Sequence, residues 1–543
     1  MENEIEQIIE KIIEMSPITK VDFDNAKRKV CGKIKTQQPS NRELLKAYQS
    51  LVKKKRIEPN KNFLLLMRKA DIRTLSGIAV ITSLTKPYAC PGQCVYCPTE
   101  ARMPKSYLAS EPAAARALSL KFDPYFMMQR RIKMLESNGH PCDKIEYIIK
   151  GGTWNAYPIK YQYWFIIESF KACNNLSRRK QVGCLDDYKN KTIEELQKLI
   201  DIEQEYNDKK AIYKIIGLTL ETRPDAVSEK TILYMRKQGC TRIELGLQAP
   251  DDRILHLVKR GHTVQQFKDA MLLLRSAGFK VDLHFMPDLP GTTPEHDVEM
   301  YESLFADPGF KPDMVKIYPN TVIKSAVLHE WLEDGRYKPY GDKELFKALL
   351  AMKLATPRYC RISRLIRDIP TDEISAGNKI TNLREALAKE LQKQGKQCQC
   401  LRCREVGHVK SERCNSKTLK LFTEQYKTTG GTEYFLSFED EGRNAVFGFL
   451  RLRLPSIQSL IFNLQSLAFI RELHTYGQLV GIGKQDTSAS QHKGLGKKLV
   501  AEAERIAKTH DFKHIAVISG VGVRGYYRKL AYRKKGTYMV KTI

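Results

Sequence analysis

The sequence lacks the features of a secreted or membrane-spanning protein. Its mean hydropathy is −0.42, and no run approaches the roughly 18 apolar residues that a spanning helix needs. The start, Met1-Glu-Asn-Glu-Ile-Glu, is acidic and has no apolar core of a secretory signal. Hydrophobic residues still make up 42% of the chain, which excludes a mainly disordered polymer. We therefore expect a folded cytoplasmic protein with no membrane contact.

Acidic residues are scarce relative to basic ones. The 543 residues include 62 Asp and Glu against 91 Lys and Arg, so the formal net charge is +29. At roughly 150 residues per domain, this length suggests about three or four domains. An excess of this size on a soluble protein indicates a polyanionic partner, with nucleic acid favoured over an anionic membrane.

The basic charge is concentrated near the N-terminus. Residues 25–70 hold fourteen Lys and Arg against two acids, with apolar residues between them at helical spacing. We interpret residues 1–72 as a basic helical domain whose densest run contacts nucleic-acid phosphates. That run is Lys53, Lys54, Lys55 and Arg56. A solvated helix face is the alternative. The acidic residues 1–24 are expected to lie outside this surface and to be dispensable.

Thirteen cysteines in a chain without an export signal predict metal ligands rather than disulfides. Cys90, Cys94 and Cys97 have Cys-x3-Cys-x2-Cys spacing, which resembles the radical S-adenosylmethionine (SAM) enzymes. Three such thiolates hold three irons of a 4Fe–4S cluster. The resemblance implies that SAM chelates the fourth iron. A zinc knuckle is the alternative, but no further Cys or His follows within forty residues of Cys97.

The remaining isolated cysteines are expected to be small buried side chains. They are Cys31, Cys142, Cys173, Cys184, Cys240 and Cys360.

Strand-like runs alternate with amphipathic segments between residues 73 and 370, which predicts βαβ units and a parallel sheet. The predicted strands include 145–149, 215–220, 243–247, 281–286 and 314–317. Such sheets bind ligands at their carboxyl edge. The residues expected to bind SAM there are Gly151, Gly152, Glu221, Arg223, Gln248 and His284. Lys316 is either a buried cation near this site or an edge lysine.

A second cysteine cluster lies in a Lys/Arg-rich connector, residues 371–414. Cys398, Cys400 and Cys403 predict a structural zinc site. Tetrahedral zinc takes four ligands, and the fourth is His408, Cys414 or none. A cluster without metal is the alternative.

Residues 415–543 show a second α/β pattern with a glycine motif at the start of a helix. Glycines there free backbone amides to hold a pyrophosphate. The segment resembles the acetyl-coenzyme A loop of GNAT acetyltransferases, and its expected contacts are Gln491, His492, Lys493, Gly494, Leu495, Gly496 and Lys497. Glu472 and His474 end the preceding strand and are candidates to polarise water or the thioester. Either Tyr526 or Tyr527 is the candidate proton donor, and packed core tyrosines are the alternative.

Nearly the whole chain is similar to the catalytic subunit of Elongator, in its stand-alone archaeal or bacterial form. The matching stretches are 73–80, 85–88, 220–225, 315–319, 367–370, 382–384, 400–408, 471–474 and 517–522. The resemblance implies a partial radical SAM (β/α) barrel joined to a GNAT domain.

The same resemblance implies an activity. The family installs a carboxymethyl group on carbon 5 of the wobble uridine of tRNA, using acetyl-CoA. An electron donor reduces the cluster, the deoxyadenosyl radical takes a hydrogen from the acetyl methyl, and the thioester is hydrolysed after addition to uridine. Lys86, just before the cysteine loop, is expected to face the cofactor or the acyl donor.

Two other functions compete with this one. The chain is alternatively a protein lysine acetyltransferase with a structural iron–sulfur domain, or a tRNA-binding scaffold without turnover. The sequence leaves open a homodimer, the tRNAs chosen, and the route of the acetyl group between the two domains.

Overall fold

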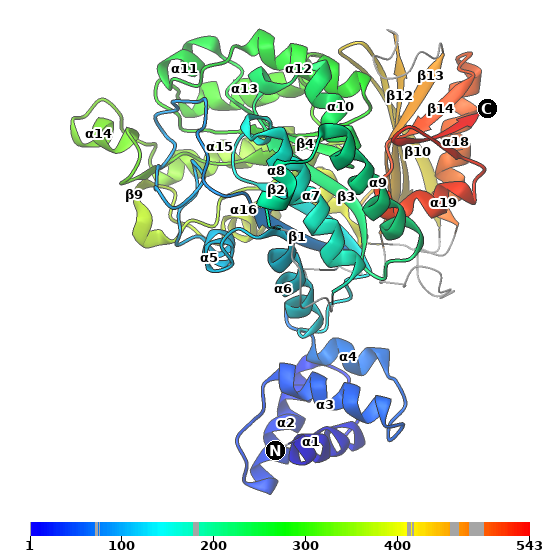
Figure 1. The fold of residues 1–543 in the computed structure, drawn as a ribbon. Helices are drawn as coiled ribbons and strands as arrows, with labels where there is room; N and C mark the ends of the chain where they lie inside the picture. The colour runs from blue at the N-terminus through cyan, green and yellow to red at the C-terminus, as the bar shows by residue number, and fades with distance from the viewer. Residues whose placement is uncertain are drawn as a thin grey trace.

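The computed structural model describes residues 2–70, 74, 76–176, 184–409, 414, 418–456, 466–476 and 494–543. Figure 1 shows a small helical domain at the N-terminus, a large barrel of strands and helices, and a second sheet that ends the chain. No helix among these residues is both long enough and apolar enough to cross a membrane.

The N-terminal domain has four helices around an apolar core of its own. They are α1 (Glu2–Glu14), α2 (Lys20–Ile34), α3 (Asn41–Lys53) and α4 (Lys61–Met67). Helices α2 and α3 each begin with a capping box, formed by Thr19 with Asp22 and by Ser40 with Glu43. An N-cap of this kind is worth about 1 kcal/mol.

The acidic helix α1 is part of this core. Ile8, Ile9 and Ile12 are buried, and the helix packs on α2 and α3. The carboxylate of Glu6 accepts a hydrogen bond from Lys54 Nζ at 2.7 Å. The expectation that the acidic first residues are dispensable is therefore wrong, because their loss would expose apolar side chains.

Seven parallel strands form the open barrel, in the order β1-β2-β3-β4-β5-β6-β8. They are β1 (Ala79–Leu84), β2 (Lys144–Lys150), β3 (Lys214–Thr222), β4 (Arg242–Gln248), β5 (Lys280–Phe285), β6 (Met314–Ile317) and β8 (Arg361–Arg364). This is the predicted partial (β/α) barrel. The sequence reasoning missed β8, a short strand rich in Arg.

Helices cover the outer face of the barrel (Figure 1). They are α5 (Pro112–Ser119), α6 (Pro124–Glu136), α7 (Ile159–Asn174), α8 (Asp186–Lys189), α9 (Ile193–Lys209), α10 (Glu229–Lys237), α11 (Asp252–Leu257), α12 (Val264–Ser276), α13 (Pro294–Ala306), α14 (Leu328–Glu333) and α15 (Asp342–Ala355). The connector adds the strand β9 (Ile374–Gly377) and the helices α16 (Leu383–Lys393) and α17 (Leu401–Arg404). β9 pairs with β7 (Thr321–Ile323), which follows β6, in a small sheet.

The second sheet has the order β10-β11-β12-β13-β14-β16-β15. Its strands are β10 (Leu419–Thr428), β11 (Gly431–Asp440), β12 (Val446–Pro455), β13 (Leu467–Thr475), β14 (His514–Val517), β15 (Arg533–Lys535) and β16 (Tyr538–Thr542). β13 and β14 are parallel and all other neighbours antiparallel. The amphipathic helix α18 (Leu495–Thr509) packs on β11, β12 and β13, and α19 (Arg524–Arg528) follows β14.

A buried charge network joins the second sheet to the barrel. Glu433 of β11 contacts Arg275 Nη1 of α12 at 3.0 Å and Arg471 Nε of β13 at 3.0 Å. Arg471 Nη1 also donates to Asp313, just before β6, at 2.9 Å. Arg451 of β12 lies 3.7 Å from the same carboxylate. The contacts fix the second domain against the amino ends of the barrel strands.

Backbone contact reinforces this interface at Gly520. A Cβ added there would lie 1.8 Å from the carbonyl oxygen of Ile216 in β3. Only glycine permits so close an approach of the two chains. Nearby, both guanidinium amines of Arg528 donate to the carboxylate of Asp208 at 2.8 Å.

Replacing Arg471 with Ala tests the network. The change removes one ion-pair partner from each of the buried carboxylates Asp313 and Glu433. The free energy of unfolding, measured in denaturant titrations, should therefore fall by about 3–5 kcal/mol. Arg505→Ala, which breaks the exposed pair with Glu502, is the matched control and should change it little. Equal effects of the two variants would show that the network does not hold the domains together.

Candidate active site and metal centres

One continuous cavity of about 900 Å³ passes through the barrel. Its walls include inward-facing side chains at every second position of several strands, as with Glu146, Ile148 and Lys150 of β2. At the carboxyl ends of the strands it is lined by the loop of Cys90, Cys94 and Cys97. At the amino ends it is lined by Glu472, His474 and other residues of the second domain. The two sites predicted from the sequence therefore open into the same space.

The cysteine loop follows β1 and is held by backbone hydrogen bonds. Val95 N donates to Val258 O at 3.1 Å, and Leu328 N donates to Val95 O at 2.9 Å. The loop thereby projects its thiols toward the cavity. Cys90 Sγ lies 4.0 Å from Thr153 Oγ1, beside the glycines that follow β2.

Two arginines give the loop a positive environment. Arg260 Nη1 donates to Cys94 Sγ at 3.5 Å. A hydrogen bond with Cys97 and the charge of Arg260 lower the pKa of the Cys94 thiol. Arg223 is buried, and its Nη1 has no hydrogen-bond partner among the described residues. A Cβ added at Gly92, in the cysteine loop, would lie only 2.2 Å from this Nη1. Arg223 also pairs with Asp225, its Nε lying 2.9 Å from Oδ1. Three thiolate donors beside these two buried arginines fit an anionic iron–sulfur cluster.

The predicted SAM residues lie on neighbouring strand ends around this loop. Gly151 has a φ of +141°, and a Cβ there would lie 1.7 Å from Thr85 Oγ1, so only glycine fits. Gly152, Glu221 and Gln248 line the cavity, and the buried side-chain oxygen of Gln248 has no hydrogen-bond partner in the described part of the chain.

A compact charge cluster surrounds Glu221. Burial favours its protonated form, yet the charges of Lys150 and Lys316 lower the pKa of Glu221 to about 2. Burial and the charge of Lys316 lower the pKa of His284 well below its usual value, so its ring is neutral. Lys316 pairs with Glu244 and is 4% exposed on an internal strand. Of the two alternatives for Lys316, the structure shows the buried cation.

Glu472 and His474 lie at the opposite end of the cavity, on β13. Lys280 Nζ and Arg451 Nε bind the two oxygens of Glu472 at 3.2 and 2.9 Å. Lys280 and Arg451 lower the pKa of Glu472 to about 2, although burial opposes this. Burial lowers the pKa of His474 to about 4. At neutral pH the site thus holds a paired carboxylate and a neutral imidazole.

The orientation of His474 follows from one contact. Its Nε2 lies 3.2 Å from the carbonyl oxygen of Ser76. A carbonyl only accepts hydrogen bonds, so the proton of the neutral ring is assigned to Nε2. The lone pair of Nδ1 is therefore available to accept a proton.

The two candidate tyrosines occupy different places. Tyr527 is buried and lines the cavity. A Cβ added at Gly496 would lie 2.7 Å from the hydroxyl of Tyr526. This hydroxyl has no hydrogen-bond partner among the described residues. Burial raises the pKa of Tyr526 to about 12, so it carries its proton at neutral pH.

The glycine motif is described only in part. Gly494 begins α18 with a φ of +71°, and Leu495, Gly496 and Lys497 form its first turn. The predicted contacts Gln491, His492 and Lys493 lie outside the described residues.

Some predicted residues lie away from the cavity. Lys86 is exposed, with its Nζ 5.2 Å from the centre of the Tyr161 ring, and is not part of the cavity wall. In the basic run, Lys54 and Arg56 pair with Glu6 and Glu10. Half of the run is thus neutralised within its own domain, and its role in tRNA binding stays a prediction.

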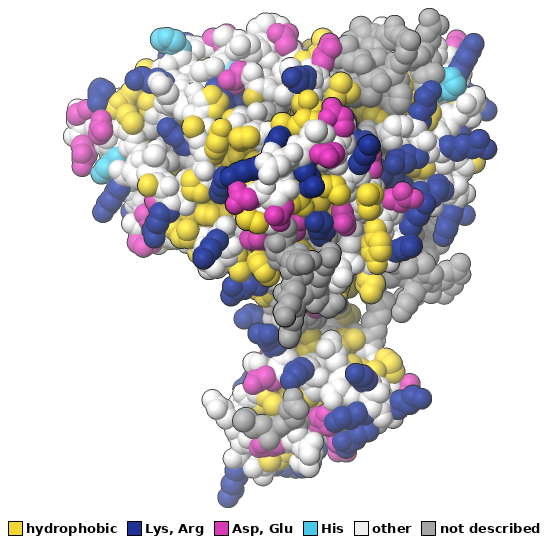
Figure 2. Space-filling model, viewed as in Figure 1, with side chains coloured by type: hydrophobic (Ala, Val, Ile, Leu, Met, Phe, Trp, Pro, Cys, Tyr) yellow, Lys and Arg dark blue, Asp and Glu magenta, His cyan; other side chains and the backbone are white. Residues whose placement is uncertain are grey.

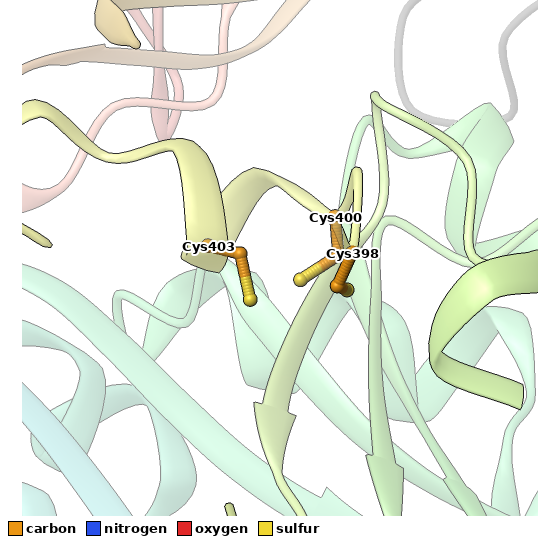
Figure 3. A group of neighbouring side chains, drawn as sticks. All are labelled: Cys398, Cys400 and Cys403. Atoms are coloured by element: carbon orange, nitrogen blue, oxygen red, sulfur yellow. The ribbon is translucent and has the colours of Figure 1, made fainter. Parts of the chain in front are cut away.

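The second cysteine cluster forms a compact triad (Figure 3). The sulfurs of Cys398, Cys400 and Cys403 all lie within 4.8 Å of one another. No fourth Cys, His, Asp or Glu joins them among the described residues. The ring of His408 contacts Arg402 and Glu405, and Cys414 packs on the core of the second domain.

Five of the six scattered cysteines are buried, as expected. They are Cys31, Cys142, Cys173, Cys240 and Cys360. Cys184 is exposed, which contradicts that expectation.

Comparison with known proteins agrees with this geometry. Residues 84–304 match the radical SAM superfamily, and residues 312–393 match the radical SAM C-terminal domain. The tRNA uridine(34) acetyltransferase of Methanocaldococcus infernus is 42% identical over 517 residues, which cover 93% of this chain and 92% of that protein. The chain belongs to this family. Elongator complex protein 3 of Homo sapiens is 37% identical over 491 residues, covering 88% and 86% of the two chains.

A solved structure supports the assignment to the tRNA uridine(34) acetyltransferase and Elongator complex protein 3 family. The archaeal Methanocaldococcus infernus Elp3 with an N-terminal deletion of residues 1–46 superposes with a TM-score of 0.73 at 38% identity. The match covers 87% of this chain and 100% of that chain.

Sequence reasoning missed several charged residues of this family member's cavity. Lys150, Lys280 and Asp282 line it, but none belongs to a short motif. The available signal was periodic: Lys280, Asp282 and His284 occupy every second position of β5, and Glu146 and Lys150 share one face of β2. Charges at every second position of buried parallel strands are unusual, because such strands are normally apolar throughout.

Proposed function

We propose that this protein converts the wobble uridine of tRNA to 5-carboxymethyluridine, with acetyl-CoA as the carbon source. The relatives named tRNA uridine(34) acetyltransferase support the substrate. The observation that carries the proposal is the single cavity shared by the cysteine loop and by Glu472 and His474. A radical source and an acyl site in one enclosure permit a transfer that neither performs alone.

The cysteine loop is the cofactor end. Cys90, Cys94 and Cys97 would hold a 4Fe–4S cluster, and Arg223 and Arg260 would balance its charge. With SAM and an external reductant, this group supplies a carbon-centred radical when bound. Glu221 and Gln248 provide fixed polar contacts for SAM at the neighbouring strand ends.

The second domain is the acyl end. Backbone amides at the start of α18 would hold the coenzyme phosphates. Nδ1 of the neutral His474 accepts a proton from the water that hydrolyses the thioester, and Tyr526 donates one to the departing thiolate. Both oxygens of Glu472 are engaged, so it positions Lys280 and Arg451 rather than acting as a base.

The barrel interior is the route between the ends. Glu146 and Lys150 mark the two ends of the cavity wall on β2, and four residues of strand span about 13 Å. The flexible arm of acetyl-CoA would enter from the amino ends of the strands and carry the acetyl methyl toward the cysteine loop.

The alternative of a protein lysine acetyltransferase fits this arrangement less well. Glu472 and His474 line the barrel cavity, and Glu472 binds a barrel lysine. A lysine on another protein would have to reach the acetyl group through that enclosure.

The reaction is tested by mass spectrometry of the tRNA wobble nucleoside. Reduced protein with SAM, acetyl-CoA and tRNA should yield the mass of carboxymethyluridine, and Cys94→Ala should abolish it. Cys240→Ala, at a buried cysteine outside the loop, is the control. Product from the Cys94 variant would contradict radical chemistry, whereas tRNA-independent acetylation of peptide lysines would favour the alternative.

The route through the barrel is tested by filling it. Ile148 lies on the cavity wall midway along β2, and Ile148→Trp should lower nucleoside formation by on the order of a hundredfold. SAM cleavage and acetyl-CoA hydrolysis, assayed separately, report on each end. Ile148→Val is the matched control. Full activity of the Trp variant would show that the acetyl group takes another path.

We infer zinc at the second cysteine cluster. Zinc–sulfur bonds of about 2.3 Å place tetrahedral ligands about 3.8 Å apart, which fits sulfurs gathered within 4.8 Å. Metal analysis should find about one zinc per chain besides iron. Cys400→Ala should lose zinc, retain iron and lower the thermal midpoint, because the cluster anchors the connector. Zinc retained by this variant would contradict the assignment.

A further inference from the structure

A second groove, of about 460 Å³, lies where the N-terminal domain meets the barrel. Its wall comes from three helices: Arg42 from α3, Arg116 from α5, and Arg130, Arg131 and Lys133 from α6. Among the residues that the structure describes, no acidic side chain lines it. Figure 2 shows Lys and Arg side chains beside the narrow neck that joins the two parts. This lining gives the described part of the groove a positive charge that suits an anionic ligand.

These cations differ from the basic run predicted from the sequence. Arg42, Arg130 and Lys133 are exposed and make no hydrogen bond or ion pair with the described residues. In contrast, Lys54 and Arg56 are paired with carboxylates of α1. The charge available to a polyanion is therefore greater in the groove than in the run at residues 53–56.

The groove lies next to the barrel cavity. Thr82, Arg116 and Arg131 line both spaces. Thr82 lies on β1, an edge strand of the open sheet, so the groove leads to the side opening of the barrel. A polymer in the groove could place one unit into the cavity without dissociating.

The chemistry of the groove suits a single RNA strand. Guanidinium and ammonium groups bind phosphodiester oxygens, and arginine planes stack on unpaired bases. The groove floor includes the apolar side chains of Leu120, Met127 and Met134, which accept base or ribose surface. An enzyme acting on a base must extrude it from the stack, so backbone contacts next to the reactive nucleotide are required.

We propose that this groove holds the phosphate backbone beside the uridine that enters the cavity. The inference rests on the proposed function, because it takes tRNA as the substrate. It assigns Arg42, Arg130 and Lys133 as positioning residues and places the RNA entrance at the β1 edge.

Binding of labelled tRNA over a range of salt concentrations tests the proposal. In the double variant Arg130→Gln/Lys133→Gln, affinity should fall by about tenfold. The slope of log affinity against log salt should become shallower by about 1.4, since each single-strand phosphate contact contributes about 0.7. Lys338→Gln/Lys343→Gln removes the same charge from exposed positions at the α14–α15 end and should change neither quantity.

The outcomes separate the groove from the overall function. Unchanged affinity and slope in the groove variant, with a wild-type protein that forms carboxymethyluridine, would overturn the groove alone. A wild-type protein that forms no modified nucleoside would overturn the proposed function. Unchanged tRNA binding with a raised KM for acetyl-CoA would assign the groove to coenzyme phosphates and overturn the RNA proposal. Equal losses in both double variants would indicate general electrostatic attraction and would also overturn it.

Discussion

The buried charge network between barrel and second sheet is the contact on which the rest depends. Glu433 and Asp313 are fully buried. Glu433 contacts arginines from both sides of the interface, and Asp313 of the barrel contacts Arg451 and Arg471 of the second sheet. Arg471 and Arg451 hold the pKa of Asp313 well below its usual value, although burial opposes ionisation. Apolar surfaces can shift slightly against each other at little cost in free energy, but a buried ion is strongly destabilising unless it is paired with an opposite charge. The network therefore fixes one orientation of the second domain.

That orientation gives the barrel its second opening. In ordinary (β/α) barrels the amino ends of the strands serve stability, and branched apolar side chains fill the interior. Here Lys280, at the amino end of β5, pairs instead with Glu472 of the second domain. Farther along, Lys150 and Lys316 pair with Glu244. Charges paired along the walls leave a polar cavity in place of a packed core, and this cavity joins two sites that the sequence places almost four hundred residues apart.

Local patterns predicted much of this architecture. The strand predicted from Ile145 to Ile149 is one residue longer at each end in the structure. The alternation of strands and helices and the spacing of the cysteines were predictable because both depend on residues that are close together in the sequence. Contacts between distant segments were not predictable in this way. Nothing near Glu433 indicates Arg275 as its partner, and nothing near Ile148 indicates a cavity wall. The acidic first helix was misjudged for the same reason, since the partners of Glu6 lie about fifty residues later.

Net charge is likewise a poor guide to where a polyanion binds. The basic run at residues 53–56 is dense in sequence, yet folding pairs Lys54 and Arg56 with acids of α1. The groove cations are dispersed in sequence from Arg42 to Lys133, and folding brings them together without an acid. Affinity for phosphates depends on cations that are available and adjacent in space, and Arg42, Arg130 and Lys133 are exposed there, which is why we favour the groove over the run. The location of the cations in the fold, rather than the net excess of +29, therefore decides where we propose that RNA binds.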